Sequence, residues 1–351
     1  MKNILVTGGA GFIGSNFIIY MLKNYEDIRL VNLDALTYAG NLENLKEIEG
    51  DGRYSFIQAD ICDGETIGEI LKEHEIDTVI NFAAESHVDR SISDPEIFIK
   101  SNVLGVSTLL GAAKRLWEKE GGGFKEGVKF LQVSTDEVYG SLGPEGFFTE
   151  TTPLDPHSPY SASKASADLL VKAYYDTFKM PVNITRCSNN YGPFQFPEKL
   201  IPLMINNCLS LKSLPVYGDG MQVRDWLYVE DHCRAIDLVA RRGVPGEVYN
   251  IGGHNERPNV FIVETIIDYL HEKVDSAIDR SLIKHVEDRK GHDRRYGIDP
   301  EKIKNELGWE PTTAFEDGIV LTMDWYLQNR DWTEKVTSGE YQKYYEEHYG
   351  K

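Results

Sequence analysis

The sequence contains only four cysteines in 351 residues, and they are scattered along the chain. Cys62, Cys187, Cys208 and Cys233 form no C-x-x-C spacing. This usage is typical of buried thiols in a reducing compartment, so it argues against both a disulfide framework and a zinc site. We therefore expect a protein without a metal ion.

Positive charge and long apolar runs are also scarce. The chain has 37 Lys and Arg against 56 Asp and Glu, which gives a formal net charge of −19. A field of that sign repels nucleic acid and anionic membranes, so we expect neither as a partner, and an anionic ligand would need a local cluster of cations. No apolar run is long enough to span a bilayer, and Met1-Lys2-Asn3 leads directly into an expected strand without a signal peptide. These shortages predict a soluble, cytoplasmic protein.

What the chain does contain is an alternation of short apolar segments and helical patterns. Strands that alternate with helices predict an α/β protein with a doubly wound parallel sheet. Small or polar residues follow the expected strand ends, which is where ligands of open α/β sheets bind. The strands are expected at residues 4–7, 29–33, 54–58, 78–82, 128–134 and 182–186, with helical spacing between them, for example at 12–22, 65–73, 102–119 and 160–178.

The pattern loosens from Tyr191 onwards, where Gly-Pro, Phe-Pro, Leu-Pro and Gly-Asp-Gly turns follow one another. We expect a smaller α/β substrate domain there, closing over the carboxyl edge of the sheet. Residues 228–241 and 247–251 have the spacing of a helix and a strand that return to the first domain. The Tyr-rich segment at 341–349 matches no function that we can assign. The expected domains are 1–190 plus about 222–252, and about 191–221 plus 253–351.

A glycine-rich turn joins the first expected strand to the first expected helix. Gly8-Gly9-Ala10-Gly11-Phe12-Ile13-Gly14 contains G-x-x-G-x-x-G and, one register over, G-x-G-x-x-G. Glycines at this spacing allow a tight turn and bring backbone N–H groups close to a pyrophosphate at a helix N-terminus. Alone, the motif also fits an ordinary glycine-rich turn.

Asp34, at the end of the second strand, strengthens the motif and indicates which dinucleotide is expected. A carboxylate at this place accepts hydrogen bonds from a ribose 2′-hydroxyl and repels a 2′-phosphate, which favours NAD over NADP. The turn and the carboxylate together predict an NAD-binding Rossmann domain. Asp60 and Ile61 at the end of the third strand would border the adenine, although Asp60 is equally suited to capping a helix.

Tyr160 and Lys164 lie four residues apart and therefore share one face of an expected helix. Ser158-Pro159 before them is typical of a helix N-cap followed by proline at the first helical position. An ammonium group and an oxidised nicotinamide nearby would both favour the phenolate, so we expect the pKa of Tyr160 to lie towards neutrality. The alternative is an ordinary Tyr and Lys on an amphipathic helix. Thr135, at the end of a central strand, offers a hydroxyl to a substrate oxygen.

Asp136 and Glu137 follow Thr135 directly. In a regular strand neighbouring side chains point to opposite faces, so both carboxyl groups can reach one substrate only if the strand has already ended. Two carboxyl groups close together tend to separate in pKa, which yields an acid and a base near neutral pH. A plain dehydrogenase does not need such a pair, so the pattern indicates an enzyme that oxidises in order to eliminate. The alternative is a solvated acidic turn or a helix cap.

With these residues in place, the chain resembles the extended short-chain dehydrogenase/reductase superfamily over nearly its whole length, and closely its dTDP-glucose 4,6-dehydratase family. Related epimerases usually lack the Asp-Glu pair after the hydroxyl residue, which makes the match at 134–140 specific. The family commonly has a proline where this chain has Lys290 in the segment 288–293. The segments that carry the resemblance are 83–91, 134–140, 186–193, 196–202, 217–220 and 223–233.

The resemblance implies a reaction on a nucleotide-linked glucose. Tyr160 would take the proton of the 4-hydroxyl as hydride passes from C4 to NAD⁺. Glu137 would then remove the C5 proton while Asp136 protonates the departing 6-hydroxyl, and hydride would return to C6. NAD would be regenerated in each turnover and stay tightly bound, and the product would be dTDP-4-dehydro-6-deoxyglucose.

The resemblance also implies which residues surround the ligands. The catalytic residues would be Thr135, Asp136, Glu137, Tyr160 and Lys164. NAD would contact Gly8, Gly11, Phe12, Ile13, Gly14, Asp34, Leu36, Thr37, Asp60, Ile61, Ala83, Ala84, Ser101, Tyr160, Lys164 and Asn190. The substrate dTDP-glucose would contact Ser86, His87, Thr135, Asn189, Lys199, Leu200, Pro215, Tyr217, Arg224, Asn259, Arg289 and His292.

Other interpretations stay open at this point. A nucleotide-sugar 4-epimerase shares the fold, the NAD and the Tyr/Lys pair but gives Asp136 and Glu137 no role, whereas a non-catalytic NAD-binding protein tends to lose the Tyr or the Lys. UDP- or CDP-glucose would satisfy the same physical arguments as dTDP-glucose. The family's usual homodimer, formed by helices such as 102–119 and 160–178, is implied by the resemblance alone.

Overall fold

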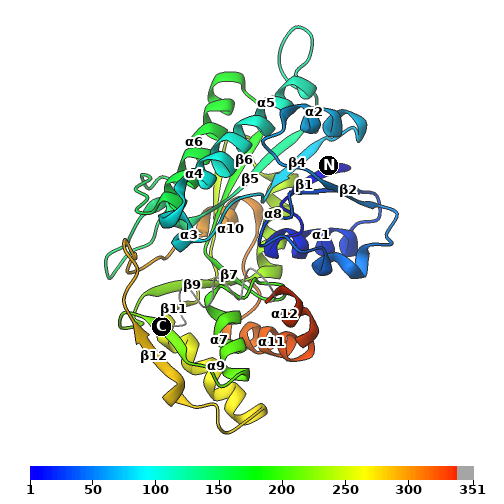
Figure 1. Cartoon of the computed structure of the whole chain (residues 1–351). Coiled ribbons are helices and arrows are strands. Elements are labelled where there is room, and N and C mark those ends of the chain that lie inside the picture. The colour runs from blue at the N-terminus through cyan, green and yellow to red at the C-terminus, as the bar shows by residue number, and fades with distance from the viewer. Residues whose placement is uncertain (338–351) are drawn as a thin grey trace.

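The computed structural model describes residues 1–337, so the Tyr-rich segment at 341–349 and the end of the expected second domain lie outside the described residues. The molecule has a larger part built on a seven-stranded sheet and a smaller part beneath it in the view of Figure 1. None of the described helices combines the length and the apolar character that a bilayer span requires.

The sheet of the larger part has the strand order β3-β2-β1-β4-β5-β6-β10, and every neighbouring pair is parallel. The chain reverses its direction of growth between β1 and β4, which is the point where ligands of such sheets bind. The predicted doubly wound Rossmann sheet is therefore confirmed. Its strands are β1 (Asn3–Thr7), β2 (Arg29–Asp34), β3 (Tyr54–Gln58), β4 (Thr78–Asn81), β5 (Lys129–Thr135), β6 (Val182–Cys187) and β10 (Val248–Ile251).

Helices cover both faces of this sheet because both faces present buried aliphatic side chains, as in other parallel sheets. The expected helix at 102–119 begins within a π-helix, η2 (Ile99–Gly105), and continues as α5. One face is covered by α1 (Phe12–Asn24), α8 (Val229–Arg242) and α10 (Glu301–Leu307), and the other by α2 (Gly64–Glu73), α5 (Val106–Trp117) and α6 (Pro159–Phe178).

The smaller part packs helices and two short sheets around a core of its own. The sheets are β7 (Asn189–Tyr191), β9 (Val223–Tyr228) and β11 (Glu256–Pro258), and β8 (Leu214–Tyr217) with β12 (Ile283–Val286). Its helices are α7 (Leu200–Leu209), α9 (Asn259–Lys273), α11 (Phe315–Gln328) and α12 (Arg330–Val336). The remaining short helices are η1 (Leu42–Ile48), α3 (Val88–Ser93), α4 (Pro95–Phe98), η3 (Asp136–Tyr139) and η4 (Arg280–Leu282).

Two segments lie in a different part from the one that the sequence predicts. β9 pairs with β7 and β11 in the smaller part, although residues from about 222 are expected in the larger one. α10, expected in the smaller part, inserts Ile303 and Leu307 into the core of the larger part beside α8 and β10. The sequence of a short amphipathic element shows that one face is buried but does not identify the partner.

Candidate active site

Two cavities lie between the carboxyl edge of the large sheet and the smaller part. The larger cavity, of about 340 Å³, follows the ends of β1, β2, β4 and β5. The smaller cavity, of about 180 Å³, is enclosed mainly by residues of the smaller part. Ligands in the two cavities would meet at the side chains that line both, which are Ser86, Glu137, Asn189, Glu198 and Lys199.

The glycine turn brings backbone against the floor of the larger cavity. Gly8 has φ +69°, and a Cβ atom there would lie 2.6 Å from the backbone nitrogen of Ala83. A Cβ atom on Gly14 would lie 2.3 Å from the carbonyl oxygen of Gly8. Gly11, the N-cap of α1, supplies no side-chain cap, so the first N–H groups of this helix are left to bind an anion.

Asp34 ends β2 at the rim of the same cavity. Its carboxylate accepts hydrogen bonds from the backbone N–H of Ala10 at 2.9 Å and of Leu36 at 2.8 Å, which fix its orientation. Burial raises the pKa of Asp34, and the two backbone hydrogen bonds oppose that shift. A carboxylate held in this way can accept the two hydroxyl groups of a ribose, as the NAD prediction requires.

The residues that the sequence assigns to the cofactor gather around the larger cavity, with the exception of Leu36. Leu36 adopts φ +53° and lies outside the lining, and its backbone N–H donates a hydrogen bond to Asp34. Asp60 lines the cavity but does not cap α2, because the N-cap is Asp63, whose side chain accepts from the N–H of Thr66. Close backbone approach at the glycines and the carboxylate of Asp34 together fit NAD.

Tyr160 and Lys164 lie in the first turns of α6 and face the larger cavity. Ser158 is the N-cap and forms a reciprocal capping box with Ser161, with Pro159 at the first helical position, so the predicted helix start is confirmed. The Nζ atom of Lys164 donates to the carbonyl oxygen of Val133 at 2.8 Å. Lys164 is buried, and burial lowers its pKa.

The protein's own groups oppose the ionisation of Tyr160. Burial raises its pKa well above the ordinary value, and the nearby Glu137, Cys187 and Asp136 raise it further, while a hydrogen bond with Thr135 lowers it. The described protein groups thus shift this pKa away from neutrality, and the expected shift towards neutrality depends on the bound oxidised nicotinamide. The oxidised nicotinamide ring of NAD⁺, which is positive, is the partner that would favour the phenolate.

Asp136 and Glu137 both reach the larger cavity because β5 ends at Thr135 and the 3₁₀-helix η3 begins at Asp136. The hydroxyl of Thr135 donates to Oδ1 of Asp136 and accepts from the N–H of Glu137, both at 3.3 Å. Asp136 is only 1% exposed, and its Oδ2 atom has no hydrogen-bond partner among residues 1–337. A solvated acidic turn is therefore excluded for Asp136.

The surroundings separate the two carboxyl groups in proton affinity. Burial, then the charges of Glu137 and Asp225, raise the pKa of Asp136 well above its ordinary value. Burial also raises the pKa of Glu137, but the cations Arg224, Lys199 and Arg289 oppose that rise. The site thus raises the pKa of Asp136 more strongly than that of Glu137, and such a separation suits an acid next to a base.

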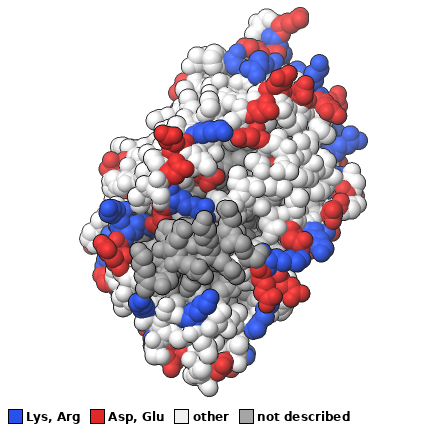
Figure 2. All heavy atoms as spheres, viewed as in Figure 1, with Lys and Arg blue, Asp and Glu red and all other residues white. Residues whose placement is uncertain are grey.

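The smaller cavity gathers the local cations that an acidic protein needs in order to bind an anion. Nζ of Lys199 donates to the carbonyl oxygen of Ser86 at 2.9 Å, and Nη2 of Arg224 to that of Asp293 at 3.0 Å. On the outer face in Figure 2, described acidic and basic side chains are interspersed. All residues predicted to contact the substrate line one of the two cavities: Ser86, His87, Thr135, Asn189, Lys199, Leu200, Pro215, Tyr217, Arg224, Asn259, Arg289 and His292.

Several residues that line this cavity are not among those predicted from the sequence, and Glu198 and Tyr296 have the most notable polar contacts of these. Glu198 is buried, lines both cavities and accepts a hydrogen bond from the hydroxyl of Tyr38 at 3.1 Å. Because Glu198 directly precedes Lys199, a predicted substrate contact, the sequence could have indicated that Glu198 lies near the site. Tyr296 lines the smaller cavity, its ring lies 4.2 Å from the guanidinium carbon of Arg224, and its hydroxyl donates to Asp293 at 2.7 Å. No motif marks Tyr296 in the sequence.

Comparison with known proteins places this geometry in a family. The family described as GDP-mannose 4,6 dehydratase matches residues 5–322. The dTDP-glucose 4,6-dehydratase of Xanthomonas campestris pv. campestris is 54% identical over 344 residues, which are 97% of each chain.

Solved structures extend the likeness to three dimensions. The dTDP-glucose 4,6-dehydratase of Bacillus anthracis, in complex with NAD, is 52% identical, with a TM-score of 0.86 over 96% of this chain and 100% of the other. The UDP-glucose 4-epimerase of Thermotoga maritima has a similar TM-score, 0.82 over 94% and 100%, but is only 29% identical. The shared fold therefore does not separate the two activities, whereas the sequence does. The chain belongs to the dTDP-glucose 4,6-dehydratase family.

Proposed function

We propose that this chain is a dTDP-glucose 4,6-dehydratase, which converts dTDP-glucose into dTDP-4-dehydro-6-deoxyglucose and water. The observation that carries the proposal is the Asp136-Glu137 pair: both residues line the larger cavity, and Glu137 also lines the smaller one. An epimerase does not require an acid and a base beside its Tyr/Lys pair. The high identity to curated dehydratases over nearly the whole chain supports the same activity.

Each catalytic side chain has one part in the reaction. When held in the larger cavity by the glycine turn and Asp34, NAD would supply the hydride acceptor for C4 and the hydride donor for C6. Tyr160 takes the proton of the 4-hydroxyl, while the Thr135 hydroxyl holds the same oxygen. Lys164, fixed on Val133, places a positive charge beside the cofactor. Glu137 removes the C5 proton, and Asp136 protonates the departing 6-hydroxyl, which leaves as water; the same carboxyl pair then returns a proton to C5 as hydride reaches C6.

The substrate is oriented by its charged end. The diphosphate lies among Lys199, Arg224, Arg289 and His292, which line the smaller cavity together with Tyr217. The ring of Tyr217 stacks on the thymine, and the glucose then extends towards the junction of the cavities. Stacking alone tolerates every base, so selectivity for thymine needs direct measurement.

The test combines a substrate panel with one double variant. The enzyme is incubated with dTDP-, UDP- and CDP-glucose, and product masses are measured; dTDP-glucose is expected to lose one water. Asp136→Asn with Glu137→Gln keeps the shape of the pair but removes the acid and the base. This variant should still form some NADH while water loss and solvent exchange at C5 fall sharply. Water loss at the unmodified rate would contradict the proposal.

We also propose a homodimer formed through the helices of one face. η2 and α6 contact each other and expose large apolar side chains. Replacing Leu104 and Leu169 with lysine should convert the dimer to monomers in analytical ultracentrifugation, while a monomeric unmodified protein would contradict the proposal. The exposed apolar residues of this region are Ile92, Ile97, Ile99, Leu104, Leu169 and Phe178.

The packing supports a modified division into domains. We assign the NAD-binding domain to residues 1–188, 229–252 and about 299–309. The described remainder forms the nucleotide-sugar domain. Hydrogen exchange measured with and without dTDP should show added protection mainly in the nucleotide-sugar domain as bounded here.

A further inference from the structure

Asp89 is a carboxylate at the edge of a cavity that gathers cations. It lies in α3 of the larger part, and its neighbour Val88, but not Asp89 itself, lines the smaller cavity. A negative charge beside an expected diphosphate weakens the attraction of the site for its ligand. The position of the Asp89 carboxylate beside this cavity therefore calls for a structural explanation.

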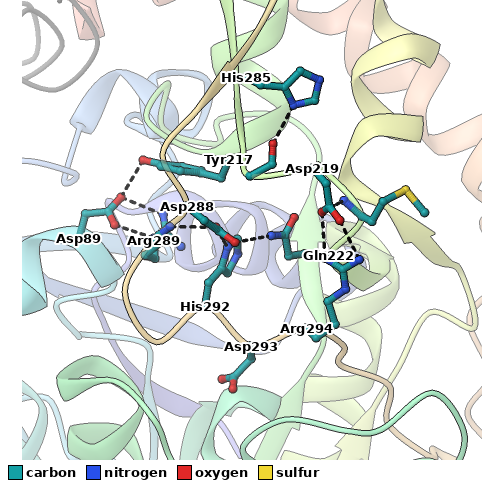
Figure 3. A network of polar contacts seen from close by, with 12 residues as sticks. Asp89, Tyr217, Asp219, Gln222, His285, Asp288, Arg289, His292, Asp293 and Arg294 are labelled. Atoms are coloured by element: carbon teal, nitrogen blue, oxygen red, sulfur yellow. Dashed lines mark hydrogen bonds and ion pairs between the residues drawn. The ribbon is translucent and has the colours of Figure 1, made fainter.

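The contacts of Asp89 are with two residues that do line the cavity. Nε and Nη2 of Arg289 donate to its two carboxylate oxygens at 2.5 and 2.8 Å, and the hydroxyl of Tyr217 lies 3.4 Å from Oδ2 (Figure 3). The guanidinium carbon of Arg289 also lies 5.0 Å from the centre of the Tyr217 ring. Arg289 is thus held by a carboxylate and beside an aromatic ring.

The pair leaves binding capacity on Arg289. A guanidinium carries five N–H groups, and the contact with Asp89 uses its Nε edge. The Nη1 side remains to bind a phosphate, in a fixed plane. Because an arginine side chain otherwise samples many rotamers, fixing it beforehand reduces the entropy lost when the ligand binds.

The surrounding loop is fixed at a second point. Asp288, next to Arg289, accepts from Gln222 Nε2 at 3.0 Å and lies 2.6 Å from Nδ1 of His292 (Figure 3). Asp288 therefore anchors the loop within the smaller part, whereas the Asp89–Arg289 pair joins it to α3 of the larger part. This second contact spans the two parts beside the nucleotide-sugar cavity.

We propose that Asp89 is a positioning residue for the diphosphate and base of the nucleotide sugar, acting through Arg289 and Tyr217. This inference rests on the proposed substrate site but not on the chemistry at C4 to C6. The proposal predicts that removing Asp89 weakens nucleotide binding, which is the opposite of what simple competition predicts. If Asp89 merely competed with phosphate for Arg289, its removal would tighten nucleotide binding.

The test measures binding and turnover separately in Asp89→Asn, with NAD content and melting temperature recorded. The Kd for dTDP and the KM for dTDP-glucose should rise about 10-fold, since a charge-assisted pair is lost, while kcat stays within about twofold. Asp89→Glu, which keeps the charge, should show a smaller rise. Asp94→Asn is the matched control, because Asp94 lies exposed at the end of the same helix.

Arg289→Ala completes a double-mutant cycle. Adding Asp89→Asn to it should change dTDP affinity by less than about twofold, because Asp89 acts chiefly through its ion pair with Arg289 and its 3.4 Å contact with Tyr217 is weaker. Tighter or unchanged dTDP binding in Asp89→Asn, full additivity with Arg289→Ala, or a loss of kcat without a rise in KM would overturn the proposal. Failure of the dehydratase function would appear separately, as absent water loss in the unmodified enzyme that still binds dTDP.

Discussion

The two cavities recognise their ligands by different means. The larger one presents backbone at Gly8 and Gly14 and one well-oriented carboxylate, Asp34, all within a short stretch of chain. The smaller one presents long charged side chains such as Lys199 and Arg289, which come from segments of the smaller part that lie far apart in the sequence. Recognition by backbone leaves a compact motif in the sequence, whereas recognition by side chains is spread along it.

The difference extends to what each cavity contributes energetically. A glycine turn is specific because any side chain there would collide with neighbouring backbone, so its tolerance for change is low. Side-chain recognition distributes binding over several cations, so single changes should weaken affinity without removing it. The predictions below test this contrast, beginning at the junction where both ligands react.

Tyr160→Phe should have the largest effect. Removing the phenolic proton acceptor should reduce turnover of dTDP-glucose by about 10²–10⁴-fold. NAD content and dTDP affinity should stay unchanged, because neither recognition device is altered. Rapid mixing with absorbance at the NADH band, together with cofactor analysis after denaturation, checks both parts. Turnover near that of the unmodified enzyme would refute the role of Tyr160.

Gly8→Ala should damage the larger cavity alone. Gly8 has φ +69° and lies close to the backbone of Ala83, so the added methyl group should weaken NAD binding by about 10–100-fold through strain. The Kd for dTDP should change little. Gly68→Ala is the control, because Gly68 lies in α2, outside the lining of the cavity, and nothing lies within 4 Å of the new Cβ. Equal NAD loss in both variants would disprove the steric argument.

Arg224→Met should damage the smaller cavity. The KM for dTDP-glucose should rise about 10-fold as a charge-assisted contact is lost, while NAD content is retained. Arg224 also lowers the pKa of Glu137, so its removal should move the acid limb of the pH–rate profile to higher pH. An acid limb that stays in place would show that Glu137 is not the base that titrates there.

His157→Asn should have the smallest effect. His157 lies 2.6 Å from Asp293, which raises its pKa above the ordinary 6.5. A raised pKa stabilises the folded state below about pH 6.5, and the stabilisation is lost as pH rises through the folded value. Because the side chain is 42% exposed, we expect only about 0.2–1 kcal/mol. The melting temperatures at pH 6 and pH 8 should differ less in the variant than in the unmodified protein. The same difference in both proteins would show that the His157–Asp293 pair does not contribute to stability.

The sequence was most informative where chemistry is local. The glycine turn, Asp34, the cap at Ser158 and the end of β5 before Asp136 each follow from residues close together in the chain. Their structural interpretation needed no knowledge of the fold beyond alternating strands and helices.

Properties that depend on distant partners could not be predicted in the same way. Tyr296 enters the smaller cavity through contacts with Arg224 and Asp293, and the pKa of Tyr160 depends on burial together with carboxyl groups on another element. Leu36 lies outside the lining of the larger cavity and contacts Asp34 through its backbone N–H. In each case the deciding interaction joins segments whose proximity only the folded chain reveals.

The way the chain is threaded through its two parts has a consequence for unfolding. Each part is built from several segments that are joined through the other part. Unfolding one part therefore frees the chain ends that the other part needs fixed, so we expect one cooperative thermal transition. Any ligand that binds only the folded state raises that shared transition by mass action. A permanently held NAD would therefore also act as a scaffold for the nucleotide-sugar half. The chain passes from one part to the other near Ser188, Tyr228 and Ile251, between Val286 and Glu301, and after Trp309.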